Sequence, residues 1–290
     1  MGPLTNGSPY KFNGYYEIKM LKKKPYNLEN KIAWITGAAS GLGKALAIEL
    51  DRKKMVLVLI DKNADGLSSL ETRLTGSKEH FSLCINLSDQ QDIIHGLDSL
   101  ADRYRNVDVL INCAAFITAG YFEDIPFEGF QQNYNVNFNA PLLLIKHAIK
   151  PMKLKKEGQI VNITSAMGRR ATPLFSSYCV TKASLNALTD SIRAELATDN
   201  INVMSVSPSA MATDIIQNSI IFSKGDTSNI KFPKMKAPEI VARKIVKGLE
   251  KRTSRIIQFS AVEILLLINI FSPSFVDWIF KKTILDKAKK

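Results

Sequence analysis

Short apolar runs alternate with segments of helical periodicity along most of this chain. Residues 55–60 are continuously apolar, which is typical of a strand buried on both faces of a sheet. Residues 43–54 instead carry their apolar side chains on one helical face. The pattern predicts strands at 32–35, 55–60, 81–85, 107–111, 159–163 and 201–206, with helices between them that include 43–54, 141–152 and 177–197.

This alternation predicts an α/β fold with one Rossmann-type, doubly wound parallel sheet in a three-layer α/β/α arrangement, because right-handed crossovers cover both faces of such a sheet. No break in composition divides the central part of the chain. We therefore expect a single domain over residues 28–258. A flexible leader at 1–27 and an apolar, basic tail at 259–290 would flank it.

A glycine-rich turn follows the first predicted strand, with the sequence Thr36-Gly37-Ala38-Ala39-Ser40-Gly41-Leu42-Gly43. Gly37 permits a tight turn, Gly41 allows the backbone to approach a pyrophosphate, and Gly43 allows close packing of the next helix. The N-terminus of that helix offers unpaired N–H groups to phosphate. In this strand–turn–helix setting the turn predicts a dinucleotide site.

Asp61 ends the second predicted strand, about twenty residues after the glycine turn. A carboxylate at this point accepts hydrogen bonds from an adenosine ribose and repels a 2′-phosphate. No arginine follows Ser40 or Asp61 directly, although Lys44 and Lys62 are near in sequence. NAD is therefore expected in preference to NADP.

Tyr178 and Lys182 lie four residues apart on a predicted helix, and Ser165 lies thirteen residues before Tyr178, just after a predicted strand. A free tyrosine has a pKa near ~10 and is a poor base at neutral pH. A lysine one helical turn away favours the phenolate. The group therefore predicts hydride transfer in which Tyr178 takes or gives a proton and Ser165 holds the substrate oxygen.

In this order the motifs resemble those of a classical short-chain dehydrogenase/reductase over roughly residues 28–250. The resemblance implies a catalytic set of Asn137, Ser165, Tyr178 and Lys182. In that set Asn137 holds a water in a proton relay, and Lys182 grips the nicotinamide ribose. It also implies cofactor contacts from Gly37, Ser40, Gly41, Leu42, Gly43, Asp61, Asn86, Leu87, Asn112, Ala114, Tyr178, Lys182, Pro208, Met211 and Thr213.

This chain departs from the family pattern at several of these positions. Cys113 and Ala115 replace the Asn and Gly that usually surround the matching alanine, and Asn86 replaces an Asp near the adenine. Ser209 replaces the glycine of a Pro-Gly element. These departures affect the surroundings of the cofactor and leave the Ser-Tyr-Lys-Asn set intact.

We therefore expect an NAD-dependent oxidoreductase that interconverts a secondary alcohol and a ketone. The stretch after Thr213 is apolar, with Ile215, Ile216, Ile220, Ile221 and Phe222, which favours a hydrophobic substrate. Two alternatives stay open. One is an NADP-linked reductase of oxoacyl or sugar carbonyls, and the other is a non-catalytic dinucleotide-binding scaffold or sensor.

The formal charge is +12, from 39 basic and 27 acidic residues, and such an excess favours nucleic acid or an anionic membrane as a partner. The basic clusters lie at residues 19–24 and 281–290, outside the motifs, and no basic groove interleaved with aromatic residues is present. Nucleic acid is therefore not expected. Three cysteines without a C-x-x-C pair indicate a reducing, cytoplasmic setting, and three histidines without ligand spacing predict no metal site.

The tail is apolar over residues 259–271 but carries Glu263, and it is shorter than the roughly 20 residues of a membrane span. Trp278 and several lysines follow. It is either an interfacial hairpin or amphipathic helix on a cytoplasm-facing membrane, or a strand and helix packed on the domain or on a partner subunit. The resemblance further implies a homodimer or homotetramer in which the helices at 141–152 and 177–197 pair with their symmetry mates.

Overall fold

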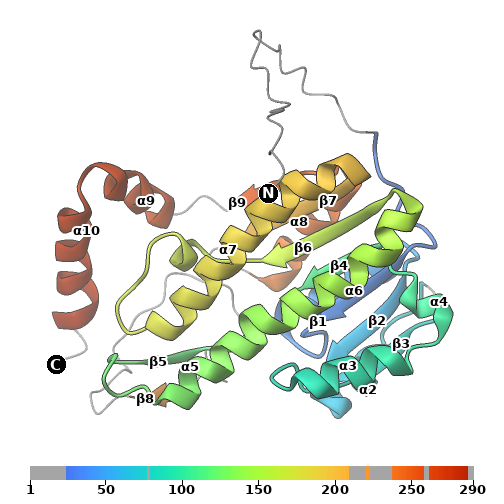
Figure 1. Cartoon of the computed structure of the whole chain (residues 1–290), viewed down its shortest axis with the longest axis horizontal. Coiled ribbons are helices and arrows are strands. Elements are labelled where there is room, and N and C mark those ends of the chain that lie inside the picture. Colours follow the sequence, from blue (N-terminus) through green and yellow to red (C-terminus); the bar gives the residue numbers. More distant parts are fainter. Residues whose placement is uncertain (1–23, 77–78, 209–219, 223–236, 258–260, 287–290) are drawn as a thin grey trace, which may run out of the picture.

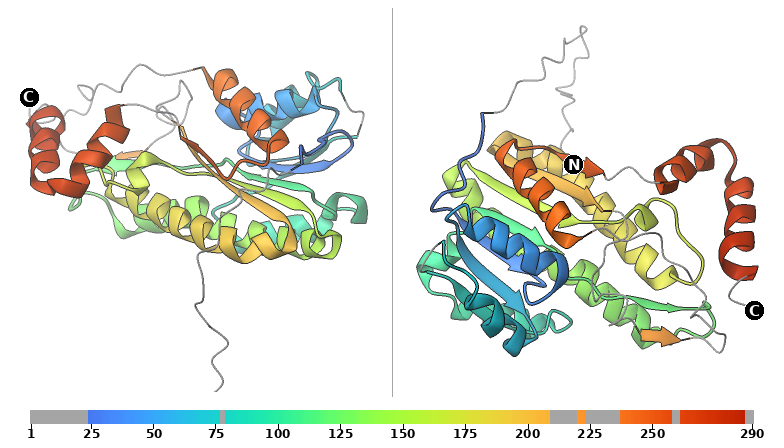
Figure 2. Two further views of the ribbon diagram at one scale, coloured as in Figure 1. Left: turned by 90° about the horizontal axis from the view of Figure 1, so that it is seen from above. Right: turned by 180° about the vertical axis from the view of Figure 1, so that it is seen from behind.

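The computed structural model describes residues 24–76, 79–208, 220–222, 237–257 and 261–286. Its centre is a parallel sheet of seven strands in the order β3-β2-β1-β4-β6-β7-β9, with helices on both faces (Figures 1 and 2). The strands of this sheet are β1 (Ile32–Thr36), β2 (Val56–Asp61), β3 (Phe81–Cys84), β4 (Val109–Asn112), β6 (Gly158–Ile163), β7 (Ile201–Ser207) and β9 (Arg255–Ile257). The predicted Rossmann-type, three-layer fold is confirmed.

The strand predictions differ from the structure at their ends. The second strand begins at Val56 and the fourth at Val109, one and two residues later than predicted. Strand β9, which pairs with β7 at the sheet edge, was not predicted from the sequence. Also not predicted was a small separate sheet in which β5 (Thr118–Gly120) pairs in parallel with β8 (Ile220–Phe222).

Helices form two layers, one on each face of the sheet, and a pair at the C-terminus. The helices are α1 (Gly41–Asp51), α2 (Ala64–Glu71), α3 (Gln90–Ser99), α4 (Asp102–Arg105), α5 (Phe127–Tyr134), α6 (Ala140–Lys155), α7 (Ser176–Leu196), α8 (Pro238–Glu250), α9 (Ala261–Phe271) and α10 (Pro273–Phe280). Shorter turns include a π-helical turn at Asn135–Asn139 and a 3₁₀ turn at Ala166–Gly168.

Strand β2 shows why a central strand of this sheet is continuously apolar. Leu57 and Leu59 belong to the core under α1, α2 and α8. Val58 and Ile60 belong to the core under α3, α6 and α7 on the opposite face. Because each large apolar side chain contributes about 1.5–3 kcal/mol when fully buried, both helical layers are held firmly on this strand.

The packed part of the chain begins earlier than predicted. Tyr26 is buried, and its N–H donates to the carbonyl oxygen of Glu250 at 2.8 Å. The predicted leader at 1–27 therefore ends too late. Residues 1–23 lie outside the described residues, and a flexible leader there stays a prediction.

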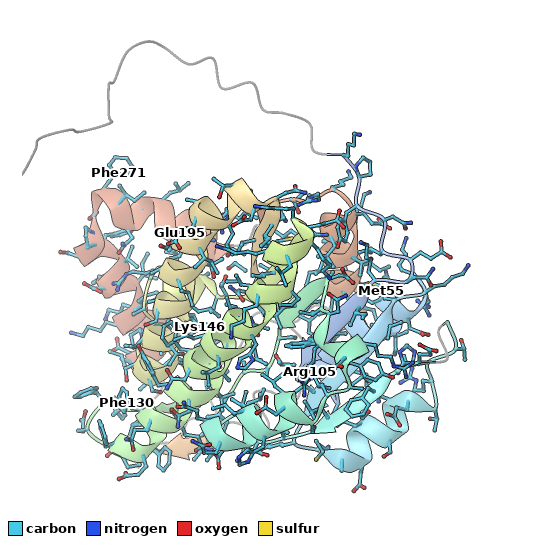
Figure 3. The ribbon with its side chains drawn as sticks, turned by 45° about the vertical axis from the view of Figure 1, so that its right-hand side comes forward. Met55, Arg105, Phe130, Lys146, Glu195 and Phe271 are labelled. Carbon is cyan, nitrogen blue, oxygen red and sulfur yellow. The ribbon has the colours of Figure 1, made fainter. Side chains whose placement is uncertain are left out.

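The tail consists of two helices, α9 and α10, which stand beside the sheet rather than in either covering layer (Figures 1 and 2). Val276 is fully buried, whereas Phe271 at the end of α9 is almost fully exposed and points away from the sheet (Figure 3). Within the described parts of the chain, no helix combines the length and apolar character needed to cross a membrane.

Candidate functional site

The glycine turn connects β1 to α1, and two of its glycines leave no room for a side chain. Gly37 has φ +69°, and a Cβ there would lie 2.9 Å from the Cα of Ala114. A Cβ on Gly43 would lie 2.0 Å from the carbonyl oxygen of Gly37. Ser40 precedes α1 without capping it through its side chain, and the first turn carries no acidic residue. The N–H groups at the start of α1, from Gly41 to Gly43, are therefore available to an anion, which fits the pyrophosphate of a dinucleotide.

The loop after β4 lies against this turn. The hydroxyl oxygen of Thr36 accepts hydrogen bonds from the N–H groups of Cys113 at 2.9 Å and Ala114 at 3.0 Å. Strands β1 and β4 are neighbours although β2 and β3 intervene in the sequence. The contact therefore marks the point where the strand order reverses, which is where open α/β sheets bind their ligands.

Asn112 lies inside the sheet rather than at its surface. Its side-chain N–H₂ donates to the Asn162 oxygen on β6 at 2.8 Å, and the Asn162 amide in turn donates to the Thr189 hydroxyl on α7 at 2.9 Å. All three residues are buried. This chain of hydrogen bonds links β4, β6 and α7 directly beneath the site.

Asp61 lies next to the glycine turn at the end of β2. One carboxylate oxygen accepts from the N–H of Ala39 and the other from the N–H of Asn63, each at 3.0 Å. A carboxylate oxygen accepts more than one hydrogen bond, so Asp61 keeps acceptor capacity for a hydroxyl. The residue is partly exposed, as a ribose contact requires.

The remaining predicted cofactor residues differ in how exposed their side chains are, and two of them lie outside the described residues. Asn86 is exposed, but its side-chain oxygen accepts from both the N–H and the hydroxyl of Ser88. The Leu87 side chain is buried in the core under α3 and α6, so only its backbone can face a ligand. Pro208 follows β7 and is partly buried. Met211 and Thr213 lie outside the described residues.

Three of the predicted catalytic residues come together where β6 ends and α7 begins. The Ser165 side chain is near enough to the Tyr178 phenol to act on it, and this interaction lowers the pKa of the phenol. The Lys182 ammonium nitrogen lies 5.6 Å from the centre of the Tyr178 ring and donates to the carbonyl oxygen of Ile163 at 2.9 Å. The cluster therefore presents a hydroxyl, a phenol and an ammonium group at the carboxyl end of a central strand.

Burial dominates the ionisation of this cluster. It raises the pKa of Tyr178 to about 12, and the interaction with Ser165 acts in the opposite direction. Burial also lowers the pKa of Lys182 to about 8. The sequence analysis expected Lys182 to favour the phenolate. In the structure burial has the largest effect on the pKa of the phenol, followed by Ser165 and Cys179, so that expectation is not met and the phenol is protonated at neutral pH.

Asn137 is fully buried in the π-helical turn between α5 and α6. Its oxygen accepts from the N–H of Phe116 and its N–H₂ donates to the Phe116 carbonyl, both at 2.8 Å. The same N–H₂ group lies 3.2 Å from the hydroxyl of Thr181, which sits between Tyr178 and Lys182 on α7. Asn137 therefore fixes the loop after β4 against the helix that carries the phenol.

Sequence reasoning missed a second set of polar contacts that holds the start of α7. The hydroxyls of Ser177 and Thr118 lie 2.7 Å apart, and the side-chain N–H₂ of Asn133 donates to Thr118. The only sequence feature that could have indicated a role for Ser177 is its position directly before Tyr178. The contacts tie β5 and α5 to the catalytic end of α7.

Comparison with known proteins agrees with this geometry. The family model of the short-chain dehydrogenases matches residues 31–221. A mouse protein, Dehydrogenase/reductase SDR family member 7B, is 30% identical over 223 residues, which cover 75% of this chain and 69% of the mouse protein. The chain belongs to the short-chain dehydrogenase family, and it is an oxidoreductase that acts on CH–OH groups with NAD(P).

Solved structures of the same fold carry either nucleotide. A short-chain dehydrogenase from Sphingobium yanoikuyae in complex with NADPH has a TM-score of 0.70 and 25% identity, over 85% of this chain and 96% of that one. An NAD⁺-bound xylitol dehydrogenase has a TM-score of 0.60 and 26% identity, over 64% and 73% of the two chains. These similarities leave the choice of nucleotide to this chain's own residues.

Proposed function

We propose that this protein is an NAD-dependent oxidoreductase that interconverts a secondary alcohol and a ketone on a hydrophobic substrate. The observation that carries the proposal is the grouping of Ser165, whose side chain acts on the pKa of the Tyr178 phenol, with Tyr178 and with Lys182 one helical turn beyond. When bound, the nicotinamide ring supplies the hydride acceptor for oxidation and the hydride donor for reduction.

The protein's own residues handle the proton. Ser165 donates a hydrogen bond to the substrate oxygen. Tyr178 in its phenolate form takes the hydroxyl proton during oxidation, and the protonated phenol returns it during reduction. Lys182 binds the nicotinamide ribose and holds positive charge beside the phenol. Asn137 positions α7 and, by family resemblance, retains a water that carries the proton onward.

The carboxylate of Asp61 supports NAD over NADP. It lies beside the glycine turn with its position fixed by the N–H groups of Ala39 and Asn63. A 2′-phosphate at this place would meet a negative charge, whereas two ribose hydroxyls would meet acceptors. The remaining proposed cofactor contacts are those of the glycine turn, Asn86, Leu87, Ala114, Pro208, Met211 and Thr213.

A second candidate is an NADP-linked carbonyl reductase. The raised pKa of Tyr178 favours it in one respect, since a protonated phenol is ready to donate to a carbonyl oxygen. The NADPH complex of the Sphingobium yanoikuyae relative is a further reason to keep it. Cofactor preference separates the two candidates.

The surface of the tail supports peripheral contact with an anionic, cytoplasm-facing membrane. Ile264, Leu267 and Ile270 of α9 are exposed, as are the stacked rings of Phe275 and Trp278 on α10. Lys281 and Lys282 follow directly and are exposed. We propose a cytoplasmic protein whose core domain includes Tyr26 and extends to about residue 258, and which forms a homodimer or homotetramer that pairs through α6 and α7.

Turnover by the full chain tests the proposal. Secondary alcohols from 2-butanol to 2-decanol are offered with NAD and with NADP, and reduced nucleotide is followed by absorbance. We expect oxidation with NAD, and with NADP at a lower kcat/KM. Higher kcat/KM with NADP would favour the second candidate. Tight NAD binding without turnover of any alcohol or ketone would instead favour a non-catalytic sensor.

A further inference from the structure

A cavity of about 310 Å³ lies between three parts of the chain that are remote in sequence. One wall is the end of β5 with the turn that follows it, and it contains Gly120 and Phe122. The second is the segment that connects Ser165 to α7, from Arg170 to Ser176, and the third is α10, with Asp277 and Phe280. The volume lies at the lower end of the roughly 300–1,000 Å³ range of small-molecule pockets.

Helix α10 is fixed in place as part of this cavity. The carboxylate of Asp277 forms an ion pair with the Arg170 guanidinium, whose carbon lies 5.3 Å from the centre of the Phe280 ring. Farther along, Ile284 and Leu285 pack against the buried cluster that contains Leu174, alongside Phe175 and Cys179. The inner side of the tail is thus a docked wall, while Phe275 and Trp278 on α10 remain exposed.

The cavity is mechanically connected to the catalytic tyrosine. Leu174 lines it, and its carbonyl accepts a hydrogen bond from the N–H of Gly120 at 2.8 Å. Ser177, directly before Tyr178, bonds to Thr118 on β5. These hydrogen bonds therefore fix two walls of the cavity, β5 and the segment that leads into α7, in position relative to the Tyr178 phenol.

The lining is chemically suited to an uncharged apolar group. Its two charged residues, Arg170 and Asp277, neutralise one another, and the other lining residues include Phe122, Phe280 and Leu174. A charged substituent would lose its hydration and would find the charge of Arg170 already paired with Asp277, so its polar contacts would be limited to Arg170 Nε and Ser176 Oγ, which have no hydrogen-bond partner among the described residues. An alkyl or ring substituent gains free energy by leaving water.

We infer that the C-terminal helix α10 completes the substrate site, and that the cavity it closes binds the apolar substituent of the alcohol or ketone. The inference rests on the proposed function for the identity of the substrate. It adds Phe122 and Phe280 as residues that set specificity, and it gives the inner face of the tail a role separate from its exposed outer face.

Binding of an unreactive probe tests the cavity without requiring turnover. Octanamide and acetamide share a polar head and differ in the alkyl chain, and their affinities for the full chain are compared by calorimetry. We expect octanamide to bind at least about tenfold more tightly than acetamide, because the chain enters the cavity. Equal affinities for the two amides would overturn the inference.

Matched variants distinguish the cavity from general surface hydrophobicity. Phe122→Ala and Phe280→Ala change two opposite walls, and each is expected to reduce the preference for octanamide severalfold. Phe127→Ala is the control for Phe122→Ala, because the two rings are about equally exposed. Phe275→Ala is the control for Phe280→Ala, because both rings are on α10. Neither control residue lines the cavity, so both variants should keep the wild-type preference. Because Phe122 is not part of α10, its variant still reports on the cavity if Phe280→Ala releases the helix.

The outcomes separate this inference from the proposed function. If Phe122→Ala and Phe280→Ala keep the same preference for octanamide as their controls, the role of α10 is overturned, whatever substrate the enzyme oxidises. Loss of octanamide preference in the lining variants alone would support the cavity, even if no alcohol were turned over and the proposed function failed.

Discussion

Replacing Lys182 with methionine should abolish turnover yet stabilise the protein at neutral pH. Lys182 is 2% exposed, and burial lowers its pKa from 10.5 to about 8. At about 1.36 kcal/mol per pKa unit, keeping the ammonium charged in the folded protein at pH 7 costs about 3 kcal/mol of unfolding free energy. Methionine has a similar length and carries no charge.

The size of the effect should depend on pH in a defined direction. Between about pH 8 and 10.5 the unfolded chain binds more protons at this position than the folded protein, so wild-type stability rises with pH there. Lys182→Met has no such term. It does lose the hydrogen bond from the ammonium group to the Ile163 carbonyl, worth about 2 kcal/mol for a charged donor. The variant should therefore be more stable by about 1 kcal/mol at pH 7, and the two proteins should be equally stable at about pH 9.

Urea unfolding of both proteins at a series of pH values measures this difference. Lys146→Met is the control, since Lys146 is exposed on α6 (Figure 3) and the same substitution there removes no buried ammonium group. A Lys182→Met protein that is less stable at pH 7, with a difference constant up to pH 10, would refute the reasoning. It would mean that the ammonium has a compensating anionic partner.

Three further predictions concern the cofactor, the membrane and the pH dependence of catalysis. Asp61→Ala should weaken NAD binding by about 10–100-fold and reduce or reverse the preference over NADP, measured by calorimetry; tighter NADP binding by the wild type would contradict this. The double variant Phe271→Ser/Trp278→Ser should bind anionic liposomes at least about tenfold more weakly than wild type. The control Leu154→Ser, which replaces an equally exposed side chain on α6, should bind them like wild type. If the wild type does not bind liposomes at low salt, the membrane proposal is wrong. Because burial raises the pKa of Tyr178 to about 12, kcat/KM for alcohol oxidation should rise from pH 7 to 10 while that for ketone reduction does not; a flat oxidation profile would contradict this.

The tail experiment uses point substitutions because the structure argues against truncation. A chain that ends near Arg255 would lose most of β9, which pairs with β7 in the sheet. It would also lose Ile284 and Leu285 from the cluster next to α7. Loss of liposome binding in such a protein would not separate an anchor from a structural element.

Local patterns were enough to predict the frame of the fold. The apolar run at 55–60 predicted β2 because a strand covered on both faces needs apolar side chains in both directions. The glycine turn was predictable for a similar reason, since close backbone approach excludes every side chain at Gly37 and Gly43. Strand β9 escaped prediction because three residues carry no periodicity, and its pairing with β7 is a tertiary contact.

Contacts between remote segments account for what the sequence could not reveal at the site. The hydrogen bond from Lys182 to Ile163 and the burial that shifts its pKa depend on how α7 packs on β6. The ion pair of Arg170 with Asp277 joins residues 107 positions apart. Spacing identified the residue types that carry the chemistry, whereas their protonation states and the third wall of the cavity follow only from packing.

Tyr178→Phe tests the central claim most directly, because it removes one oxygen from a buried ring and leaves the glycine turn untouched. The variant and a control, Tyr134→Phe on α5, are compared for NADH binding by fluorescence and for turnover of the best alcohol. The account predicts that Tyr178→Phe binds NADH like wild type and loses nearly all turnover, while the control keeps both. Near-normal turnover by Tyr178→Phe would contradict the assignment of the phenol as the proton-transferring group.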